Sequence, residues 1–268
     1  MKLLNGSELA EFIKERQAKD VRRLAASKIF PKLAIVQVKD DPVINTYVRL
    51  KKGYGADIGI EVEQHRPKQA DVPQLLKKLN SDKTVNGIIV QLPLSDISQT
   101  DEIVNLVAPE KDVDALGHKS QYEPATPMAI LWLLAGYGVE LKNKNILLIG
   151  RGKLVGEPLE KILRNSGYDV EIIAREVEDL GKHTKNADII ITATGSPAVL
   201  YPDMIKHGAV VVDAGVASEL GKTVGDLSPE VYKRDDLTIT PQKGGVGPLT
   251  VCALFENVIR AASKTANA

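Results

Sequence analysis

The sequence predicts an α/β fold with two lobes and a cleft between them. Short apolar runs recur along the chain and alternate with amphipathic stretches at helical spacing, which is typical of helices that connect parallel strands. Residues 108–127 interrupt this alternation with three prolines and no periodic pattern. Because such a stretch is typical of a domain boundary, we expect one lobe at residues 1–120 plus 247–268 and the other at residues 121–246.

The first lobe is expected to hold three strands, at 32–38, 60–64 and 87–93. Four helices are expected around them. Ser7 is the predicted cap of the first helix, and Pro42 lies in the first turn of the second. The helices are predicted at 8–26, 42–59, 72–80 and 101–107.

The second lobe is expected to repeat the same alternation. A helix at 127–134 leads into its first strand, a helix with Pro158 near its start follows that strand, and a final helix covers 249–262. The predicted strands are 145–149, 169–173, 188–192, 209–213 and 237–239. A parallel sheet follows from this order.

Composition excludes several classes of function. Lys and Arg together number 35, as do Asp and Glu, so the net charge is zero and no basic excess favours nucleic acid or an anionic membrane. Cys252 is the single cysteine, which fits a reducing compartment, and we expect a cytoplasmic protein. The four histidines are scattered without metal-ligand spacing. We therefore expect no metal site, no nucleic-acid partner and no membrane partner.

A glycine loop connects the strand 145–149 to the helix that follows it. Its sequence is Gly150-Arg-Gly-Lys-Leu-Val-Gly156. Glycines let a backbone turn sharply and approach a pyrophosphate, and a helix N-terminus presents unpaired N–H groups to it, so the loop favours a dinucleotide. The alternative is an ordinary tight turn between a strand and a helix.

Two sets of residues in the first lobe have the chemistry of a site. Tyr47 and Lys51 are four residues apart, so they share one helix face, and a lysine beside an aromatic ring can be desolvated and used in proton transfer. Gln91 is a polar residue at the carboxyl end of an apolar strand, where ligands of parallel sheets bind. The alternatives are a solvated helix face and a polar residue that ends a strand.

Two further motifs lie in loops. Lys111-Asp-Val-Asp114 places acids in the boundary segment, where they can accept hydrogen bonds from a heterocycle or form a solvated turn. Gly244-Gly-Val-Gly-Pro248 suggests a backbone held close to a ligand, a helix cap, or both.

Taken in order, these stretches resemble one family, the bifunctional methylenetetrahydrofolate dehydrogenase/methenyltetrahydrofolate cyclohydrolases. The resemblance covers about residues 33–260. The motifs that carry it are Asp40-Asp-Pro42 with Tyr47 and Lys51, Gly87-Ile-Ile-Val-Gln-Leu-Pro-Leu94, Lys111-Asp-Val-Asp114, Pro124-Ala-Thr-Pro127, Gly150-Arg151 through Val155-Gly156-x-Pro158, and Thr240-Pro241 with Gly244-Gly-Val-Gly-Pro-Leu-Thr250.

The resemblance implies that methylenetetrahydrofolate is oxidised by a nicotinamide cofactor and that the methenyl product is hydrolysed to formyltetrahydrofolate. It implies that Lys51 assists proton movements, Tyr47 stacks on the folate, Gln91 hydrogen-bonds the lysine and Asp114 holds the pterin ring. The implied folate-binding set is Tyr47, Gln91, Pro93, Asp114, Gly245, Val246, Gly247 and Pro248. It also implies a homodimer.

The implied cofactor-binding set is Gly150, Arg151, Gly152, Val155, Gly156, Arg175, Thr194, Gly195 and Val216. The position after the strand 169–173 meets the adenosine ribose, where an acid suits NAD and an arginine suits the 2′-phosphate of NADP. The chain has Arg175 and then Glu176 at this place. We expect NADP, with NAD as the alternative.

Three departures from the family pattern define the alternatives. Ile44 stands where a serine is usual, Gly152 replaces a serine of the cofactor loop, and Ala115 replaces a glycine in a shortened segment. A dehydrogenase with weak or lost cyclohydrolase activity is therefore one alternative. A non-catalytic folate- or nucleotide-binding homologue is another.

Overall fold

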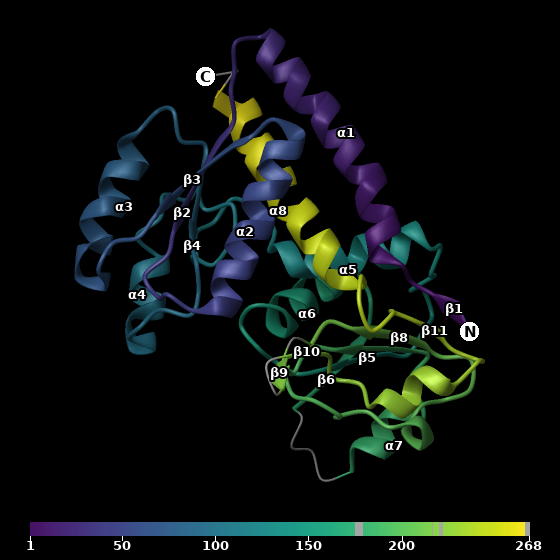
Figure 1. The fold of residues 1–268 in the computed structure, drawn as a ribbon. Helices are drawn as coiled ribbons and strands as arrows, with labels where there is room; N and C mark the ends of the chain where they lie inside the picture. The colour runs from purple at the N-terminus through teal and green to yellow at the C-terminus, as the bar shows by residue number, and fades with distance from the viewer. Residues whose placement is uncertain (175–178, 216, 220–221, 266–268) are drawn as a thin grey trace. The chain divides into compact units, whose positions relative to one another are not determined.

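The computed structural model describes residues 1–174, 179–215, 217–219 and 222–265 (Figure 1). The chain divides into two compact units. We call Met1–Ala10 with Thr126–Thr250 the six-stranded unit, and Glu11–Ala125 with Val251–Ala268 the three-stranded unit. Helices α1 (Gly6–Ala26) and α8 (Val246–Thr265) each begin in the six-stranded unit and continue into the other. The predicted fold class, two α/β units with parallel sheets, is confirmed.

The three-stranded unit is built on a parallel sheet in the order β3-β2-β4. Its strands are β2 (Lys32–Val36), β3 (Glu61–His65) and β4 (Gly87–Val90). Helices α3 (Val72–Ser81) and α4 (Thr100–Val104) cover one face (Figure 1). The apolar core on that face consists of Ala34, Val36, Val72, Leu76, Leu79, Val85, Ile88, Val90, Leu94, Ile103, Val104 and Val107.

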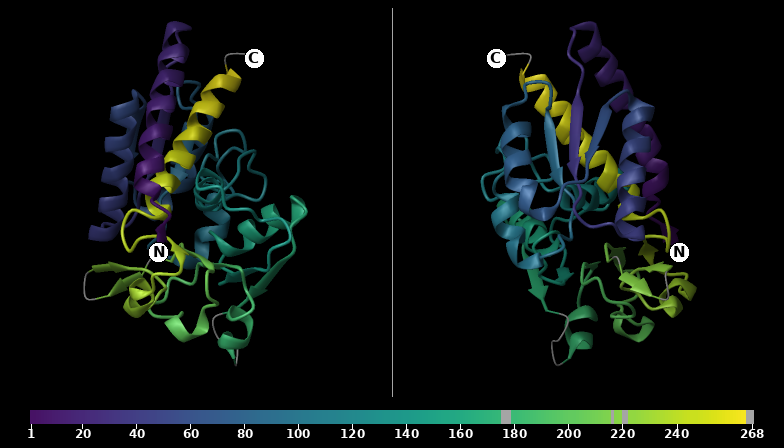
Figure 2. Two further views of the ribbon diagram at one scale, coloured as in Figure 1. Left: turned by 90° about the vertical axis from the view of Figure 1, so that its right-hand side faces the viewer. Right: turned by 60° about the vertical axis from the view of Figure 1, so that its left-hand side comes forward.

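Helix α2 (Pro42–Ile58) lies on the other face of this sheet, next to α8 in Figure 1, and Figure 2 shows α2, α1 and α8 grouped together. The rings of Tyr54 on α2 and Phe255 on α8 pack with their centroids 5.0 Å apart. The carboxylate of Asp41 caps α2 by accepting hydrogen bonds from the backbone N–H groups of Val43 and Ile44. This cap fixes the start of the helix that carries Tyr47 and Lys51.

The six-stranded unit contains a wholly parallel sheet in the order β1-β11-β8-β7-β5-β6. Counted from β5, the neighbouring strands β6, β5, β7, β8 and β11 run 2-1-3-4-5, a doubly wound order with its switch point between β5 and β7. The strands are β1 (Lys2–Leu3), β5 (Ile146–Ile149), β6 (Val170–Ile173), β7 (Ile189–Thr192), β8 (Val210–Asp213) and β11 (Thr238–Ile239).

Other elements complete this unit. Helices α5 (Ala125–Gly136), α6 (Gly156–Asn165) and α7 (Leu180–Thr184) connect or precede its strands, and β9 (Ala217–Glu219) pairs antiparallel with β10 (Lys222–Val224). One face of the sheet buries Leu147, Ile149, Ile173, Ala187, Ile190, Leu200, Ile205, Ala209, Val211, Leu227, Val231, Leu237 and Ile239.

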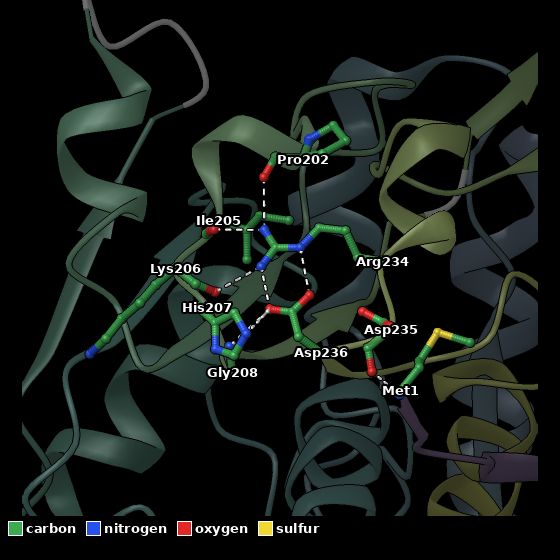
Figure 3. A network of polar contacts seen from close by, with 9 residues as sticks. All are labelled: Met1, Pro202, Ile205, Lys206, His207, Gly208, Arg234, Asp235 and Asp236. Carbon is green, nitrogen blue, oxygen red and sulfur yellow. Dashed lines mark hydrogen bonds and ion pairs between the residues drawn. The ribbon is translucent and has the colours of Figure 1, made fainter.

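Arg234 fixes the turn that leads into β8 (Figure 3). Its guanidinium donates hydrogen bonds to the carbonyl oxygens of Pro202 at 2.8 Å and Ile205 at 2.7 Å, and it is paired with Asp236. The carboxylate of Asp236 in turn accepts a hydrogen bond from the backbone N–H of Gly208 at 3.1 Å. The bond to Arg234 holds the pKa of Asp236 below its usual range. This network stabilises the amino edge of the sheet, opposite the strand ends that ligands approach.

The structure differs from the sequence expectations at several elements. The predicted cap Ser7 is wrong, because Ser7 lies inside α1 and the side chain of Asn5 accepts the hydrogen bond from the backbone N–H of Glu8. Strand β4 ends at Val90, so Gln91 follows the strand instead of lying in it. Elements β1, α7, β9 and β10 were not predicted, because their short runs lack a periodic pattern. The exact lobe boundaries and the cleft stay predictions.

Within the described residues, no helix has the length and apolarity needed to cross a membrane.

Residues 112–117 form a loop that follows a single bridge between Ile88 and Asp112. The buried carboxylate of Asp112 accepts hydrogen bonds from the backbone N–H groups of Gly117 at 2.8 Å and Leu116 at 3.4 Å. Ala115, in the middle of the loop, has a φ of 56°, which lies in the left-handed region. The loop therefore holds Asp114 in place at the cost of one strained alanine.

Ala115→Gly is expected to stabilise the protein. A left-handed conformation costs a residue with a Cβ about 1–2 kcal/mol, and glycine adopts it freely but loses more chain entropy on folding. We expect the free energy of unfolding to rise by about 1 kcal/mol, measured by urea denaturation. The matched control is Ala56→Gly, at an exposed position inside α2, which should lower the same quantity by about as much. If both variants were less stable than wild type, the inference that Ala115 is strained would be wrong.

Asp112 is expected to make stability depend on pH. Burial raises the pKa of its carboxyl to about 6, and Asp114 adds to this, whereas the hydrogen bond from Gly117 opposes it. Because the folded-state pKa is raised, the stabilising effect of the proton is full below the unfolded pKa and is lost as pH rises through about 6. Asp112→Asn has no such proton to lose. Its stability relative to wild type should therefore improve by about 1.5 kcal/mol between pH 5 and pH 8 in urea denaturation. Parallel pH profiles would contradict the raised pKa.

Candidate functional site

Lys51 and Gln91 form the centre of the candidate site in the three-stranded unit. The Nζ atom of Lys51 donates a hydrogen bond to the Oε1 atom of Gln91 at 2.8 Å. Gln91 comes directly after β4, at the carboxyl end of the sheet, and its own Nε2 atom donates to the carbonyl oxygen of Leu92 at 3.1 Å. This second bond orients the side-chain amide so that its oxygen faces the lysine. The structure thus joins two residues that the sequence singled out separately.

The charge of Asp114 acts on this lysine. Burial lowers the pKa of Lys51, and the negative charge of Asp114 opposes the shift. Reciprocally, burial raises the pKa of Asp114 and the charge of Lys51 lowers it. A desolvated lysine with a lowered pKa exchanges protons near neutral pH more readily than an exposed one. The site therefore has the electrostatics of an acid–base centre.

Tyr47 lies one helical turn before Lys51 on α2, and 36% of its surface is exposed. A half-exposed ring at this position offers a flat apolar surface to a ligand. Pro93 is also exposed and follows Gln91 closely in sequence. By contrast, Ile44 is 4% exposed and packs in the core, so the departure from the family pattern at this position adds an apolar side chain to the interior.

The six-stranded unit holds the candidate cofactor loop. Gly150 follows β5 with a φ of 104°, and a Cβ added to it would stand 2.5 Å from the carbonyl oxygen of Ala193. Gly156 begins α6, and a Cβ added there would stand 2.0 Å from the carbonyl oxygen of Gly150. Only glycine permits these approaches. The loop after β5, the start of α6 and the loop after β7 are therefore packed backbone against backbone at the switch point of the sheet.

The remaining predicted cofactor residues are distributed as follows. Gly152 has open space where its side chain would be, Val155 is the residue before α6, and Thr194 and Gly195 lie in the loop after β7. Arg151 is exposed and is paired with Glu160 at 3.6 Å. Arg175 and Val216 lie outside the described residues.

The predicted folate-binding residues Gly245, Val246, Gly247 and Pro248 belong to the six-stranded unit, at the start of α8. The carbonyl oxygen of Gly244 accepts a hydrogen bond from the backbone N–H of Ser7 at 2.9 Å. Gly247 is exposed, whereas Gly245 and Val246 are buried. The backbone of this motif therefore contacts the start of α1.

Sequence reasoning missed two carboxyl groups of the six-stranded unit, those of the partly buried Asp213 and the fully buried Asp226. Asp213 ends β8, so the rule that singled out Gln91, a polar residue at the carboxyl end of a parallel strand, applies to it as well. Asp226 carries no such signal, because its partners lie about thirty residues earlier in the chain.

Comparison with known proteins places these features in one family. The family profile described as tetrahydrofolate dehydrogenase/cyclohydrolase, catalytic domain, matches residues 4–114, and the profile described as its NAD(P)-binding domain matches residues 124–266. The chain is similar to the bifunctional protein FolD 2 of Lactobacillus johnsonii, with 38% identity over 271 residues that cover 96% of each protein.

Two solved structures are similar as well. The bifunctional FolD enzyme of Campylobacter jejuni, a methylenetetrahydrofolate dehydrogenase/cyclohydrolase, has 35% identity and a TM-score of 0.93 over 99% of each chain. The Trypanosoma brucei methylenetetrahydrofolate dehydrogenase-cyclohydrolase (FolD), complexed with NADP and an inhibitor, has 27% identity and a TM-score of 0.93 over 99% of this chain and 98% of its own. From the two profiles and this identity, the chain belongs to the tetrahydrofolate dehydrogenase/cyclohydrolase family.

Proposed function

We propose that this protein oxidises 5,10-methylenetetrahydrofolate to 5,10-methenyltetrahydrofolate with NADP and then hydrolyses the product to 10-formyltetrahydrofolate. In the first step the bridging carbon loses a hydride and becomes part of a cation. In the second step water adds to that carbon, one carbon–nitrogen bond breaks and one proton is released. Family membership and the similar bifunctional enzymes support both steps.

The observation that carries the proposal is the hydrogen bond between Lys51 and Gln91 at 2.8 Å, with the charge of Asp114 acting on the same lysine. Water attacks the methenyl carbon faster when a base removes its proton, and the leaving nitrogen needs a proton as the ring opens. Lys51, with its pKa lowered by burial, is the group suited to both transfers. Gln91 holds the amine in one direction, and Asp114 is proposed to bind the pterin.

The glycine loop fits a dinucleotide, because it turns sharply after β5 at the switch point of the sheet, where dinucleotides bind in doubly wound folds. Bound NADP would supply the hydride acceptor. Thr194 and Gly195, in the loop after β7, are proposed to line the same cofactor. The relative that is complexed with NADP supports this cofactor form over NAD.

We also propose that the protein is a cytoplasmic homodimer. Cys252 is the single cysteine of the sequence, so it has no second cysteine of the chain to pair with, which suits a reducing compartment. The family resemblance supports the dimer, and sedimentation velocity would show a species of twice the chain mass. A monomer at all concentrations would contradict it.

A spectrophotometric assay tests the function. The purified protein is given methylenetetrahydrofolate with NADP or with NAD, and reduced cofactor and methenyltetrahydrofolate are followed separately. Reduced cofactor without methenyl accumulation, above the rate of spontaneous hydrolysis, indicates both activities. Methenyl accumulation in step with reduced cofactor would replace the proposal with a dehydrogenase that lacks effective cyclohydrolase. If neither cofactor supports turnover, the protein would instead be a non-catalytic folate- or nucleotide-binding homologue.

Lys51→Met is expected to lower the rate of methenyltetrahydrofolate hydrolysis at least 100-fold, because a positioned acid–base group contributes about 10²–10⁴-fold. Folate affinity should stay within a few-fold, since Tyr47 and Asp114 remain. The matched control is Lys52→Met, which removes the exposed neighbouring lysine of the same helix and should hydrolyse at the wild-type rate. Undiminished hydrolysis in Lys51→Met would remove this lysine from the mechanism.

Arg175→Ala is expected to weaken NADP much more than NAD. A guanidinium bound to the 2′-phosphate contributes about 1.5–3 kcal/mol, so the NADP dissociation constant should rise roughly 10- to 100-fold. NAD has no such phosphate and serves as the internal control. Equal weakening of both dinucleotides, measured by calorimetry, would overturn the assignment of Arg175 to the phosphate.

A further inference from the structure

A single carboxylate holds the loop that follows β7. One oxygen of Asp226 accepts a hydrogen bond from the backbone N–H of Thr194 at 2.7 Å, and the other accepts from that of Ser196 at 3.0 Å. The backbone N–H of Val199 also donates to the carbonyl oxygen of Asp226 at 2.7 Å. Hydrogen bonds to an ionised carboxylate are stronger and more directional than those between neutral groups. Asp226 therefore ties the beginning and the middle of this loop to one point.

The position of Asp226 is itself tightly determined. Its side chain is fully buried, and a Cβ added to Gly215 would stand 1.9 Å from its Oδ1 atom. The backbone N–H groups of Asp226 and Leu227 donate to the two oxygens of Asp213 at 3.0 Å and 3.2 Å. Asp213, at the end of β8, thus anchors the segment that carries Asp226. The chain of contacts runs from a central strand to the loop after β7.

The loop that Asp226 holds lies at the switch point of the sheet. Ala193 and Thr194 come directly after β7, and a Cβ added to Gly150 would stand 3.1 Å from the backbone nitrogen of Thr194. Displacement of this loop would therefore disturb the glycine loop after β5. Ligands of doubly wound sheets bind at this crevice, outside the carboxyl ends of the strands.

We propose that Asp226 is a positioning residue for the dehydrogenase step: its carboxylate sets the loop of Thr194 and Gly195 against Gly150 and so preforms the dinucleotide site. The inference rests on the proposed binding of the dinucleotide at this crevice. It gives Asp226 no part in the hydrolysis, which is proposed to use Lys51, Gln91 and Asp114.

Asp226→Asn tests the inference with little change in volume. The amide keeps one acceptor and turns an N–H₂ group toward one of the two backbone donors, so the loop must shift. We expect the NADP dissociation constant, measured by calorimetry, and the KM for NADP to rise at least tenfold. The rate of methenyltetrahydrofolate hydrolysis, which consumes no dinucleotide, should stay within twofold of wild type.

Asp188→Asn is the matched control. Asp188 precedes β7 at the amino edge of the same sheet, where it accepts a hydrogen bond from the backbone N–H of Asn145 at 3.0 Å and pairs with Lys206 at 2.6 Å. Within the part of the chain that the structure describes, the hydrogen-bonding partners of its carboxylate, Asn145 and Lys206, both lie outside the crevice loops. This variant should lose stability through a broken ion pair but bind NADP as wild type does.

Three outcomes overturn the inference: unchanged NADP binding in Asp226→Asn, an equal loss of NADP binding in Asp188→Asn, or a parallel loss of hydrolysis, which would show a general structural role. A wild type that binds NADP without turnover overturns the proposed function alone, and one that binds neither NADP nor NAD overturns both.

Hydrogen exchange on the wild type covers the case in which Asp226→Asn does not fold. The amides of Thr194 and Ser196 should be protected before any dinucleotide is added, because Asp226 already accepts their hydrogen bonds. Exchange of these two amides at the rate of an open chain in the free protein would overturn the preformed site.

Discussion

Parallel pairing is the constraint on which the rest of this structure depends. Every neighbour in both larger sheets runs in the same direction, so all the strands of a sheet end at one edge. Parallel strands require crossover connections, and the loops that leave the strands at their carboxyl ends are brought together whatever their separation in sequence. Gln91 after β4, Gly150 after β5 and Thr194 after β7 are all placed by this rule.

Each candidate site lies at the carboxyl edge of its own sheet, and the two edges carry different chemistry. In the three-stranded unit the edge carries side chains whose charges interact: burial lowers the pKa of Lys51, and the charge of Asp114 limits the shift. In the six-stranded unit the edge carries backbone, packed so closely that glycine is required at Gly150 and Gly156. Proton transfer needs a titratable group, and binding of a pyrophosphate needs a backbone that it can approach closely, so each arrangement suits its proposed step.

The sequence was a good guide where function coincides with the end of an apolar run. The fold class, Gln91 and the glycine loop followed from periodicity and strand ends, whereas the roles of Tyr47 and Lys51 came from family resemblance. The sequence failed where a contact spans distant loops. Asp226 acts by accepting hydrogen bonds from backbone N–H groups about thirty residues earlier in the chain, and no residue pattern records which loop such an acceptor will meet. The cap of α1 was missed for a similar reason. Pairing of β1 with β11, which is distant in the sequence, determines where α1 begins, so that Asn5 is its cap.

The discontinuous make-up of the two units has a consequence for how the protein emerges from the ribosome. The six-stranded unit needs β1 at residues 2–3 to meet β11 at residues 238–239, and the three-stranded unit needs Phe255 to pack on Tyr54. Synthesis proceeds from the N-terminus at about 5–20 residues per second, and a continuous domain can fold while the rest is made. Here neither unit can close until residues 239 and 255, respectively, have been translated, so the nascent chain must keep its early apolar strands from aggregating during that interval.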